Sequence, residues 1–167
     1  MLRIVDLGCG RNKQPGALGV DIHRFDGVDR VIDLEKVPWE LPSNQFDVVY
    51  MLQVLEHLQN PAEVMLELYR ICAPGALVFI QVPNGYCDGF AQDPTHKKAW
   101  NLGTFIYFAG PEQWPGEWNE KYYDFGTHFR ILHYDVAQNP GRMPWGAPIF
   151  KDNLTVILQA VKEGMDG

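Results

Sequence analysis

The segment Val5-Asp6-Leu7-Gly8-Cys9-Gly10 decides how this chain of 167 residues folds. Apolar residues lead directly into a carboxylate and two glycines, which predicts a buried strand over residues 2–7 that ends in a tight turn. Glycines at the carboxyl end of such a strand let the backbone approach a ligand that a side chain would exclude. Open α/β sheets bind ligands at these strand ends. The first ten residues therefore predict a small-molecule site.

The spacing of the glycines bears on the class of ligand. A dinucleotide-binding fold is indicated by G-x-G-x-x-G at the start of a helix, but Lys13 takes the position of the third glycine. By itself, the pair formed by Gly8 and Gly10 also fits an ordinary strand-to-loop turn. A nicotinamide-dependent oxidoreductase remains an alternative, although the chain lacks both the third glycine and the helix that this class carries after the turn.

Polar residues also end the next three apolar segments. The patterns predict strands over residues 18–22, 28–33 and 46–52. Asp21 and Asp33 lie at the ends of the first two segments, and Gln53 follows the third. A carboxylate at the end of the chain's second strand can accept both hydroxyls of a ribose, and one after the third strand can accept an adenine amino group. These positions predict a nucleoside ligand.

In these motifs the sequence resembles the class I S-adenosylmethionine-dependent methyltransferases, particularly the small branch related to ubiquinone biosynthesis. The matching motifs follow in the expected order over about the first half of the chain. They are Asp6-Leu7-Gly8-Cys9-Gly10, Gly19-Val20-Asp21, Asp33-Leu34, Phe46-Asp47-Val48-Val49, Val54-Leu55-Glu56-His57 and Pro74-Gly75-Ala76-Leu77. The resemblance implies an α/β fold, with a doubly wound, Rossmann-like, mostly parallel sheet of about seven strands that ends in an antiparallel pair. It also implies S-adenosylmethionine as the cofactor.

The resemblance implies roles for most residues of the expected cofactor site. Glycines 8 and 10 permit close approach of the ligand, Asp21 accepts the ribose hydroxyls, and Asp33 with the Leu34 backbone recognises adenine. Asp6 anchors the methionine amino group, directly or through water, and Gln53 lines the methyl-transfer channel. The complete expected set is Asp6, Gly8, Cys9, Gly10, Asp21, Ile22, Asp33, Leu34 and Gln53.

The connection between the first two predicted strands departs from the family pattern. Only residues 11–17 separate Gly10 from the next strand, and they are too few and too rich in breakers to form the usual crossover helix. We therefore expect a compressed first crossover. Two interpretations of it remain open: Asn12 and Lys13 contact the ligand in place of a helix N-terminus, or the turn simply faces solvent.

The rest of the chain continues the alternation of strands and helices. Asn60 as the cap and Pro61 at the first position predict a helix that ends at Pro74-Gly75. Further strands are predicted over 76–82, 129–136 and 154–161. We expect a single domain over 1–167, with a cofactor-binding half over 1–82, an aromatic-rich substrate-facing segment over 83–130 and terminal antiparallel strands over 131–167.

The segment 83–130 holds 12 of the 21 aromatic residues of the chain. It leaves the carboxyl end of a predicted strand, so we interpret it as the layer that faces the substrate. The alternative is that most of its rings form a satellite core that fixes a long loop. Aromatic rings at the mouth of the site suit a small planar or apolar acceptor, but they suit loop packing equally well.

The sulfonium of S-adenosylmethionine is already a strong electrophile, so the protein mainly holds the acceptor in line and excludes water. A base is required only for an acceptor whose proton has a high pKa. Candidate catalytic residues are His57, which follows Glu56, and His96, which Asp93 is close enough in sequence to orient. Structural roles for both histidines remain open. A metal ion held by His57, His96 and Asp93 is possible in principle, but their spacing does not demand one, and none is expected.

The composition of the chain bears on its binding partners and on its location in the cell. The 14 basic and 21 acidic residues give a net charge of −7, which opposes non-specific binding to nucleic acid. No apolar run approaches the ~20 residues that cross a bilayer. Three cysteines without C-x-x-C spacing and the lack of a signal peptide suit the cytoplasm.

The first predicted strand begins near residue 2, so the helices that many relatives place ahead of it as a lid are not expected. The cofactor site would then be open, and a second subunit of a homo-oligomer or a large substrate would complete it. A binding subunit that keeps the cofactor fold without turnover remains an alternative to an enzyme with a small-molecule acceptor.

Overall fold

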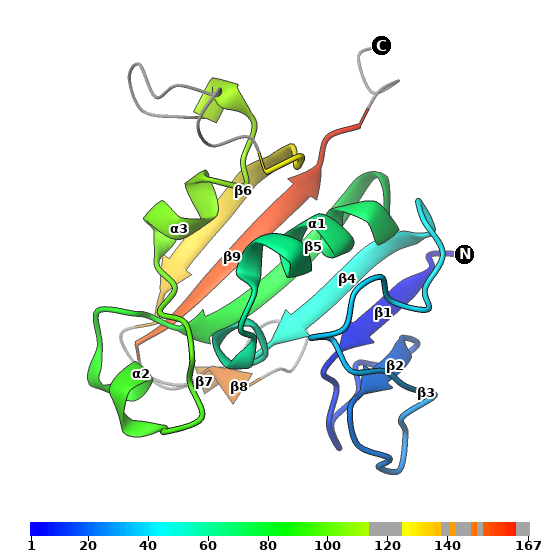
Figure 1. The fold of residues 1–167 in the computed structure, drawn as a ribbon, viewed down its shortest axis with the longest axis horizontal. Coiled ribbons are helices and arrows are strands. Elements are labelled where there is room, and N and C mark those ends of the chain that lie inside the picture. Colours follow the sequence, from blue (N-terminus) through cyan, green and yellow to red (C-terminus); the bar gives the residue numbers. More distant parts are fainter. Residues whose placement is uncertain (114–124, 138–140, 143–147, 150–151, 163–167) are drawn as a thin grey trace.

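The computed structural model describes residues 1–113, 125–137, 141–142, 148–149 and 152–162. Its main sheet has seven strands in the order β3-β2-β1-β4-β5-β9-β6 (Figure 1). The strands are β1 (Ile4–Leu7), β2 (Leu18–Asp21), β3 (Arg30–Val31), β4 (Phe46–Leu52), β5 (Cys72–Pro83), β6 (Phe129–Val136) and β9 (Asn153–Ala160). Neighbours from β3 to β5 are parallel, whereas β9 runs antiparallel to both β5 and β6. The predicted fold class is confirmed.

The compressed first crossover is also confirmed. Residues 8–17 form turns without a helix, yet β1 and β2 pair in parallel with Val5 opposite Leu18. The backbone N–H groups of Gly8 and Cys9 both donate to the Val20 carbonyl, at 2.8 and 3.0 Å. This shared acceptor fixes the first bend against the end of β2. The two hydrogen bonds thereby supply part of the constraint that a crossover helix would provide.

Helix α1 (Pro61–Ile71) crosses between β4 and β5 and covers both strands (Figure 1). Its buried side chains Val64, Leu68 and Ile71 lie at helical spacing and join the core of the sheet. The helix begins at Pro61 as predicted but ends at Ile71, three residues early, because Cys72 already pairs with Phe46 and starts β5. No helix in the described residues is long and apolar enough to cross a membrane.

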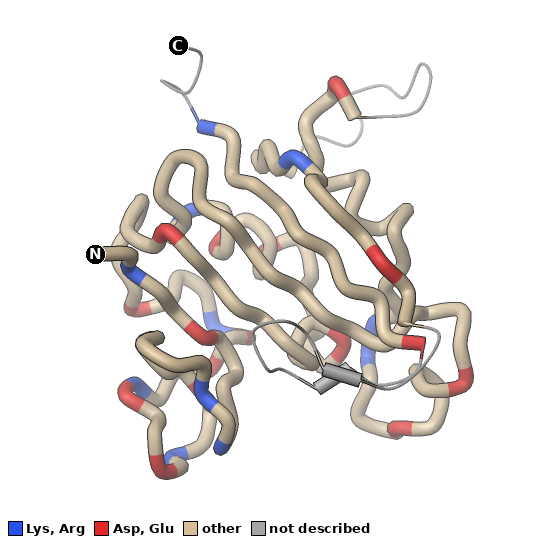
Figure 2. The backbone as a smooth tube through the Cα atoms, turned by 180° about the vertical axis from the view of Figure 1, so that it is seen from behind, with Lys and Arg blue, Asp and Glu red and all other residues tan. Residues whose placement is uncertain are grey.

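Strands β5 and β9 form the centre of the molecule. Neither strand carries a charged residue, and both appear uniformly uncharged from behind (Figure 2). Val78, Ile80, Val156 and Leu158 are fully buried. A continuously apolar strand is typical of a sheet interior, so the remaining polar side chains of these strands are exceptional and bear on the site described below.

The segment after β5 contains two short helices, α2 (Asp88–Gln92) and α3 (Leu102–Ile106), and the short 3-10 helix η2 (Pro111–Gln113). A second 3-10 helix, η1 (Leu55–His57), lies between β4 and α1. Many rings of the segment after β5 form a satellite core: Trp100 lies 4.9 Å from Phe105 and 6.1 Å from Phe108 between ring centroids. All three are buried, and α3 lies against β6 (Figure 1). Trp114, Trp118, Tyr122 and Tyr123 lie outside the described residues.

A separate two-stranded sheet pairs β7 (Gly141–Arg142) with β8 (Pro148–Ile149). Most of the residues around these strands lie outside the described part of the chain.

The satellite core predicts a clear contrast between two aromatic residues of the same segment. Phe105→Ala should lower the free energy of unfolding by about 3–5 kcal/mol, because it removes a fully buried ring. Tyr86→Ala should change it by less than about 0.5 kcal/mol, because Tyr86 is 84% exposed. Denaturant unfolding of both variants checks this, and equal losses would contradict a core role for the segment.

Candidate functional site

The bend after β1 requires glycine at position 8. Gly8 has a φ of +72°, and a Cβ added there would overlap the Cγ2 atom of Val54, which lies beyond β4. The backbone of this bend therefore approaches the segment after β4 more closely than any side chain would permit. The same glycine lines a cavity, so the close approach occurs at the wall of a potential binding site.

Asp21 ties the ends of β1 and β2 together. One of its carboxylate oxygens accepts the N–H of Gly10 at 2.8 Å, and the other accepts the N–H of His23 at 2.9 Å. The side chain is buried, but each carboxylate oxygen has a further lone pair for a ligand. Gly10 adopts a φ of +53°, which directs its N–H toward this carboxylate.

Asp6 and Cys9 are buried and do not line the cavity. Asp6 is buried and accepts the N–H of Gln14 at 2.8 Å, which anchors the loop of the first crossover. Burial, opposed by that hydrogen bond and reinforced by the charge of Asp21, raises the pKa of Asp6 to about 6. Burial also raises the pKa of the Cys9 thiol to about 11, so this thiol is protonated and unreactive at neutral pH.

Lys13 has a structural partner in the same loop. Its Nζ atom lies 2.7 Å from the Asp29 carboxylate, which also accepts the N–H of Gly19. The lysine thus fixes the crossover loop against the turn after β2. This contact favours the structural interpretation of the turn over ligand contact through Lys13.

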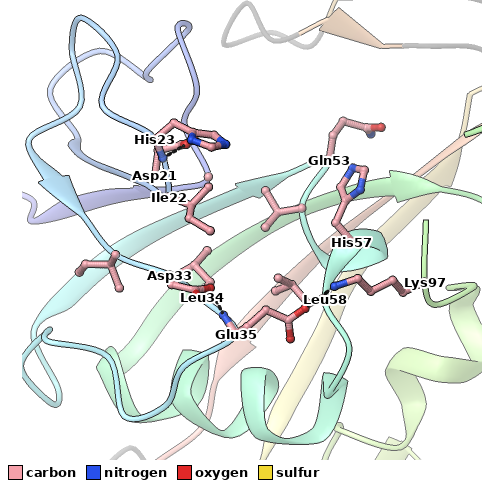
Figure 3. Close-up of a pocket in the computed structure, with 13 residues that line it drawn as sticks. Asp21, Ile22, His23, Asp33, Leu34, Glu35, Gln53, His57, Leu58 and Lys97 are labelled. Atoms are coloured by element: carbon pink, nitrogen blue, oxygen red, sulfur yellow. Dashed lines mark hydrogen bonds and ion pairs between the residues drawn. The ribbon is translucent and has the colours of Figure 1, made fainter. Parts of the chain in front are cut away.

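A cavity of about 520 Å³ opens at the carboxyl edge of the parallel strands. Asp21, Ile22 and His23 form one side, and Gln53, His57 and Lys97 form the opposite side (Figure 3). Of the nine predicted cofactor residues, the structure brings six to this cavity: Gly8, Asp21, Ile22, Asp33, Leu34 and Gln53. The other three, Asp6, Cys9 and Gly10, do not line the cavity.

An ion pair that joins distant segments lies in the wall of the cavity. The Glu35 carboxylate accepts the N–H of Gln59 at 3.0 Å and lies 2.7 Å from the Nζ atom of Lys97 (Figure 3). Asp33 accepts the N–H of Glu35 at 3.1 Å and so shapes the turn that precedes it. The turn after β3 is therefore linked to the segment after β5.

Gln53 occupies the exit of β4 in a constrained conformation. Its φ of +59° is uncommon for a residue other than glycine and costs about 1 kcal/mol. Its N–H donates to the Gln81 carbonyl at 2.8 Å, and a buried network joins the side chains of Gln81, Thr155 and Asn153. The buried polar residues of β5 and β9 thus support the strained residue at the cavity wall.

A second cavity of about 600 Å³ adjoins the first. Gln53 lines both cavities, whereas His57 lines only the first and His96 only the second. The remaining wall of the second cavity is formed mainly by residues around α2: Gly89, Gln92, Asp93 and Pro94, together with Pro83 and Asn153. This part of the aromatic-rich segment faces the cavity, while Trp100, Phe105 and Phe108 are buried in the satellite core.

The two candidate histidines come together at the boundary of the cavities. Their ring centroids are 4.9 Å apart, in an edge-to-face arrangement. The contact follows from main-chain hydrogen bonds, since the Glu56 carbonyl in η1 accepts the N–H groups of Lys97 at 2.7 Å and Lys98 at 3.2 Å. His57 and His96 are 39 positions apart in the sequence, so only tertiary structure juxtaposes them.

Glu56 is buried beside these histidines. Its side chain is fully inaccessible, and neither carboxylate oxygen has a hydrogen-bond partner within the described part of the chain. Burial raises the pKa of Glu56 to about 7. The other buried glutamate, Glu67, accepts hydrogen bonds from the Trp39 N–H and from Arg70, as buried carboxylates usually do.

Sequence reasoning missed part of the first cavity's lining. The additional residues are His23, Ile32, Glu35, Val54, Leu58 and Lys97. Those that follow the predicted strand ends, such as His23 and Glu35, lie next to Asp21 and Asp33 at the carboxyl edge, which was a usable signal. Lys97 carried no such signal, because its place depends on how the segment after β5 folds back.

A family model described as a methyltransferase domain matches residues 2–135. The ubiquinone biosynthesis O-methyltransferase of Pseudomonas entomophila (strain L48) is 35% identical over 104 residues, which cover 49% of this chain and 44% of that protein. The chain thus spans somewhat under half the length of the curated relatives that it matches.

Solved structures agree on the fold. An S-adenosylmethionine-dependent methyltransferase from Archaeoglobus fulgidus superposes with a TM-score of 0.62 at 17% identity, over 95% of this chain and 86% of that one. One from Mesorhizobium loti gives a TM-score of 0.58 at 17% identity, over 95% and 90%. At this identity the likeness concerns the architecture alone.

The two glycines of the first bend should differ in their tolerance of alanine. Gly10→Ala should cost about 1–2 kcal/mol, the usual penalty of a left-handed backbone, because a Cβ there meets no atom within 4 Å. Gly8→Ala should cost more and weaken ligand binding at the cavity, because its Cβ also overlaps Val54. Denaturant unfolding of the single variants, and of Gly8→Ala combined with Val54→Ala, separates the cost of the left-handed backbone from the cost of the steric overlap. Failure of the second substitution to recover any stability would contradict the steric explanation.

Asp6 should make stability depend on pH. The folded protein keeps the Asp6 proton up to about pH 6 while the unfolded chain loses it near pH 4, so stability falls as the pH rises between these values. At 1.36 kcal/mol per pH unit, the contribution is about 3 kcal/mol. Asp6→Asn should remove this part of the decline, measured by urea unfolding at pH 4, 5, 6 and 7. If the free energy of unfolding depended on pH in the same way in both proteins, Asp6 would not be the source of the decline.

Proposed function

The chain belongs to the class I S-adenosylmethionine-dependent methyltransferases, and from that premise we propose that it transfers a methyl group to a hydroxyl of a small molecule. The observation that carries the proposal is the pair of adjoining cavities with Gln53 in the wall of both. We assign the first cavity to S-adenosylmethionine and the second to the acceptor. In this arrangement the methyl group crosses the boundary beside Gln53.

The first cavity suits the nucleoside in size and chemistry. Its volume of about 520 Å³ falls within the range of small-molecule sites. Asp21 would accept the ribose hydroxyls with its free lone pairs, while Asp33 and the Leu34 backbone would recognise the adenine edge. Ile22, which is 54% exposed, would cover one face of the ring. Asp6 would stabilise the methionine ammonium group through the loop or a water molecule.

Transfer is a displacement in line with the breaking C–S bond. The cofactor supplies the electrophilic methyl group, so the chain needs to orient the acceptor oxygen and exclude water. Gln53 is suited to orient groups at the boundary, because its strained backbone and the Gln81 network hold it in one conformation. The wall around α2, with Phe90 stacked on His96 at 5.5 Å, would bind an apolar or planar acceptor.

Removal of the acceptor proton falls to the two histidines. His96 presents its Nδ1 atom to the Phe90 carbonyl at 2.8 Å, which fixes the proton on Nδ1 and leaves the Nε2 lone pair available. A hydroxyl in the second cavity would give its proton to this lone pair as its oxygen attacks the methyl group. His57, on the cofactor side, would position the reacting groups.

The choice of a small-molecule hydroxyl draws on the curated relatives, which are O-methyltransferases, and on the acidic balance of the chain. We also infer that the protein acts in the cytoplasm, where the free cysteines Cys9, Cys72 and Cys87 would stay reduced. A second copy of the chain is our candidate for covering the exposed rim of the cofactor cavity at Ile22.

Binding and transfer test the proposal separately. S-adenosylhomocysteine should raise the melting temperature of the chain by mass action, while NAD should leave it unchanged. Asp21→Asn should weaken S-adenosylhomocysteine binding in calorimetry by about 10-fold or more, because it replaces an ionised acceptor of the ribose. Asp26→Asn, on the exposed turn after β2, is the matched control and should bind normally.

Labelled methyl transfer from S-adenosylmethionine to a panel of small phenols and alcohols, followed by mass identification of the product, tests turnover. Stabilisation by NAD would favour an oxidoreductase. Binding of S-adenosylhomocysteine without transfer to any pool would favour a cofactor-binding subunit. No uptake of either adenosyl compound by folded protein would refute the proposed function.

A further inference from the structure

We propose that Glu56, His57 and His96 form a binding site for a divalent transition-metal ion at the boundary of the two cavities. Each side chain offers one ligand atom, and the three atoms lie within 4.8 Å of one another. In the sequence, the spacing of His57, His96 and Asp93 does not demand a metal, and none is expected from it. The fold brings Glu56, His57 and His96 together, and three further observations support a cation at this place.

The first observation is the state of the Glu56 carboxylate. A buried carboxylate normally accepts several hydrogen bonds, because an unpaired one carries the full penalty of desolvation. Glu56 has no such partner within the described residues, although its side chain is fully buried. A cation coordinated by this carboxylate would compensate its charge and its missing hydrogen bonds together.

The second observation is the orientation of the imidazoles. Metal-binding histidines usually donate the N–H of one ring nitrogen to a carbonyl or another acceptor, and this frees the other nitrogen for the ion. His96 has this arrangement, with Nδ1 at 2.8 Å from the Phe90 carbonyl. Its Nε2 lone pair is thereby available.

His57 is oriented in the same way by Thr95. The Thr95 hydroxyl donates to the Asp93 carboxylate at 2.7 Å, so its oxygen acts as an acceptor toward the Nδ1 atom of His57 at 3.1 Å. The proton of His57 then resides on Nδ1, and its Nε2 lone pair is also free. Two imidazoles with the same tautomer therefore flank an unpartnered carboxylate.

The third observation is the rigidity of the frame. The Glu56 carbonyl binds the backbone of Lys97 and Lys98, so η1 and the segment that carries His96 hold one another in place. Around a tetrahedral ion with ligand bonds of about 2.0–2.2 Å, ligand atoms are about 3.3–3.6 Å apart. Side-chain rotations that close the triangle by about 1 Å would complete the site without movement of this backbone.

The donor set indicates the class of ion. Two imidazole nitrogens and one carboxylate oxygen suit Zn²⁺, Fe²⁺ or Co²⁺, whereas Mg²⁺ and Ca²⁺ prefer oxygen ligands. Three protein ligands also leave coordination positions open, as in catalytic rather than structural sites. The Asp93 carboxylate, 3.7 Å from His96 Nε2, adds negative charge beside the site.

The role of the ion rests on the proposed function. At the boundary of the cavities, an open coordination position would bind the acceptor hydroxyl and lower its pKa. The O–H proton would leave to solvent, the oxygen lone pair would form the new C–O bond, and the electrons of the C–S bond would remain on sulfur. With the ion bound, its Lewis acidity would replace the proton transfer to His96 proposed above, and both histidines would act as ligands.

Cobalt titration tests the site directly. The whole chain, freed of metal with a chelator, should bind one equivalent of Co²⁺ and develop visible d–d absorption, and Zn²⁺ should displace it. Mg²⁺ should produce no displacement. Glu56→Gln and His96→Gln should each weaken Co²⁺ binding by at least about 100-fold, because even an outer partner of a metal ligand is worth 10–100-fold. Glu56→Gln removes no hydrogen bond between described residues, so we expect it to fold.

His128→Ala is the matched control, because His128 lies 3.0 Å from Glu112 in an exposed histidine–glutamate pair remote from the cavities. It should leave the cobalt spectrum unchanged. The proposal would be overturned by the lack of a cobalt spectrum, by equal loss in the control, or by unchanged binding in Glu56→Gln. Calorimetry with S-adenosylhomocysteine on the same samples separates the two proposals, since cofactor binding without cobalt binding refutes only the metal site, and the reverse refutes only the proposed function.

Discussion

The two hydrogen bonds accepted by Asp21 are the constraint on which the site depends. They join the bend after β1, through the Gly10 N–H, to the turn after β2, through the His23 N–H. Because the first crossover has no helix, these bonds act together with the Val20 carbonyl, the Lys13–Asp29 pair and the Asp6–Gln14 hydrogen bond. Hydrogen bonds to buried carboxylates thus supply part of the constraint that a crossover helix provides in a doubly wound sheet.

Buried polar groups concentrate where the sheet meets the cavities. The otherwise apolar strands β5 and β9 place Gln81 and Asn153 beneath Gln53, whose backbone is held in a left-handed conformation. Glu56 adds a carboxylate without a partner in the described residues only a few positions further on. Each of these features is unfavourable in isolation. Their occurrence together at one edge of the sheet is typical of a functional site, where the surrounding fold stabilises what the local sequence does not.

The aromatic-rich segment serves two purposes at different depths. Trp100, Phe105 and Phe108 are buried and fix the segment to the sheet, which gives it a rigid base. The portion before them, from Phe90 to Lys97, is then held over the carboxyl edge, where the Glu56 carbonyl and Glu35 bind it. The satellite core and the cavity wall are therefore two consequences of the same fold, and the burial of the rings is what lets a loop contribute His96 to the boundary of the cavities.

The sequence by itself determined where the seven strands of the main sheet lie, the short first crossover and the polar residues at the strand ends, because these depend on local periodicity and on turn chemistry within a few positions. It placed Asp21 and Gln53 at the cavity for the same reason. It did not record that β3 is limited to Arg30–Val31, that β5 already begins at Cys72, or that β7 pairs with β8. Only the tertiary structure decided that Asp6 and Cys9 do not line the cavity, and that Glu56 and His57 meet His96. Such contacts join segments far apart in the chain, and they arise from how β5 and the segment after it pack against the sheet, which no local pattern of residues records.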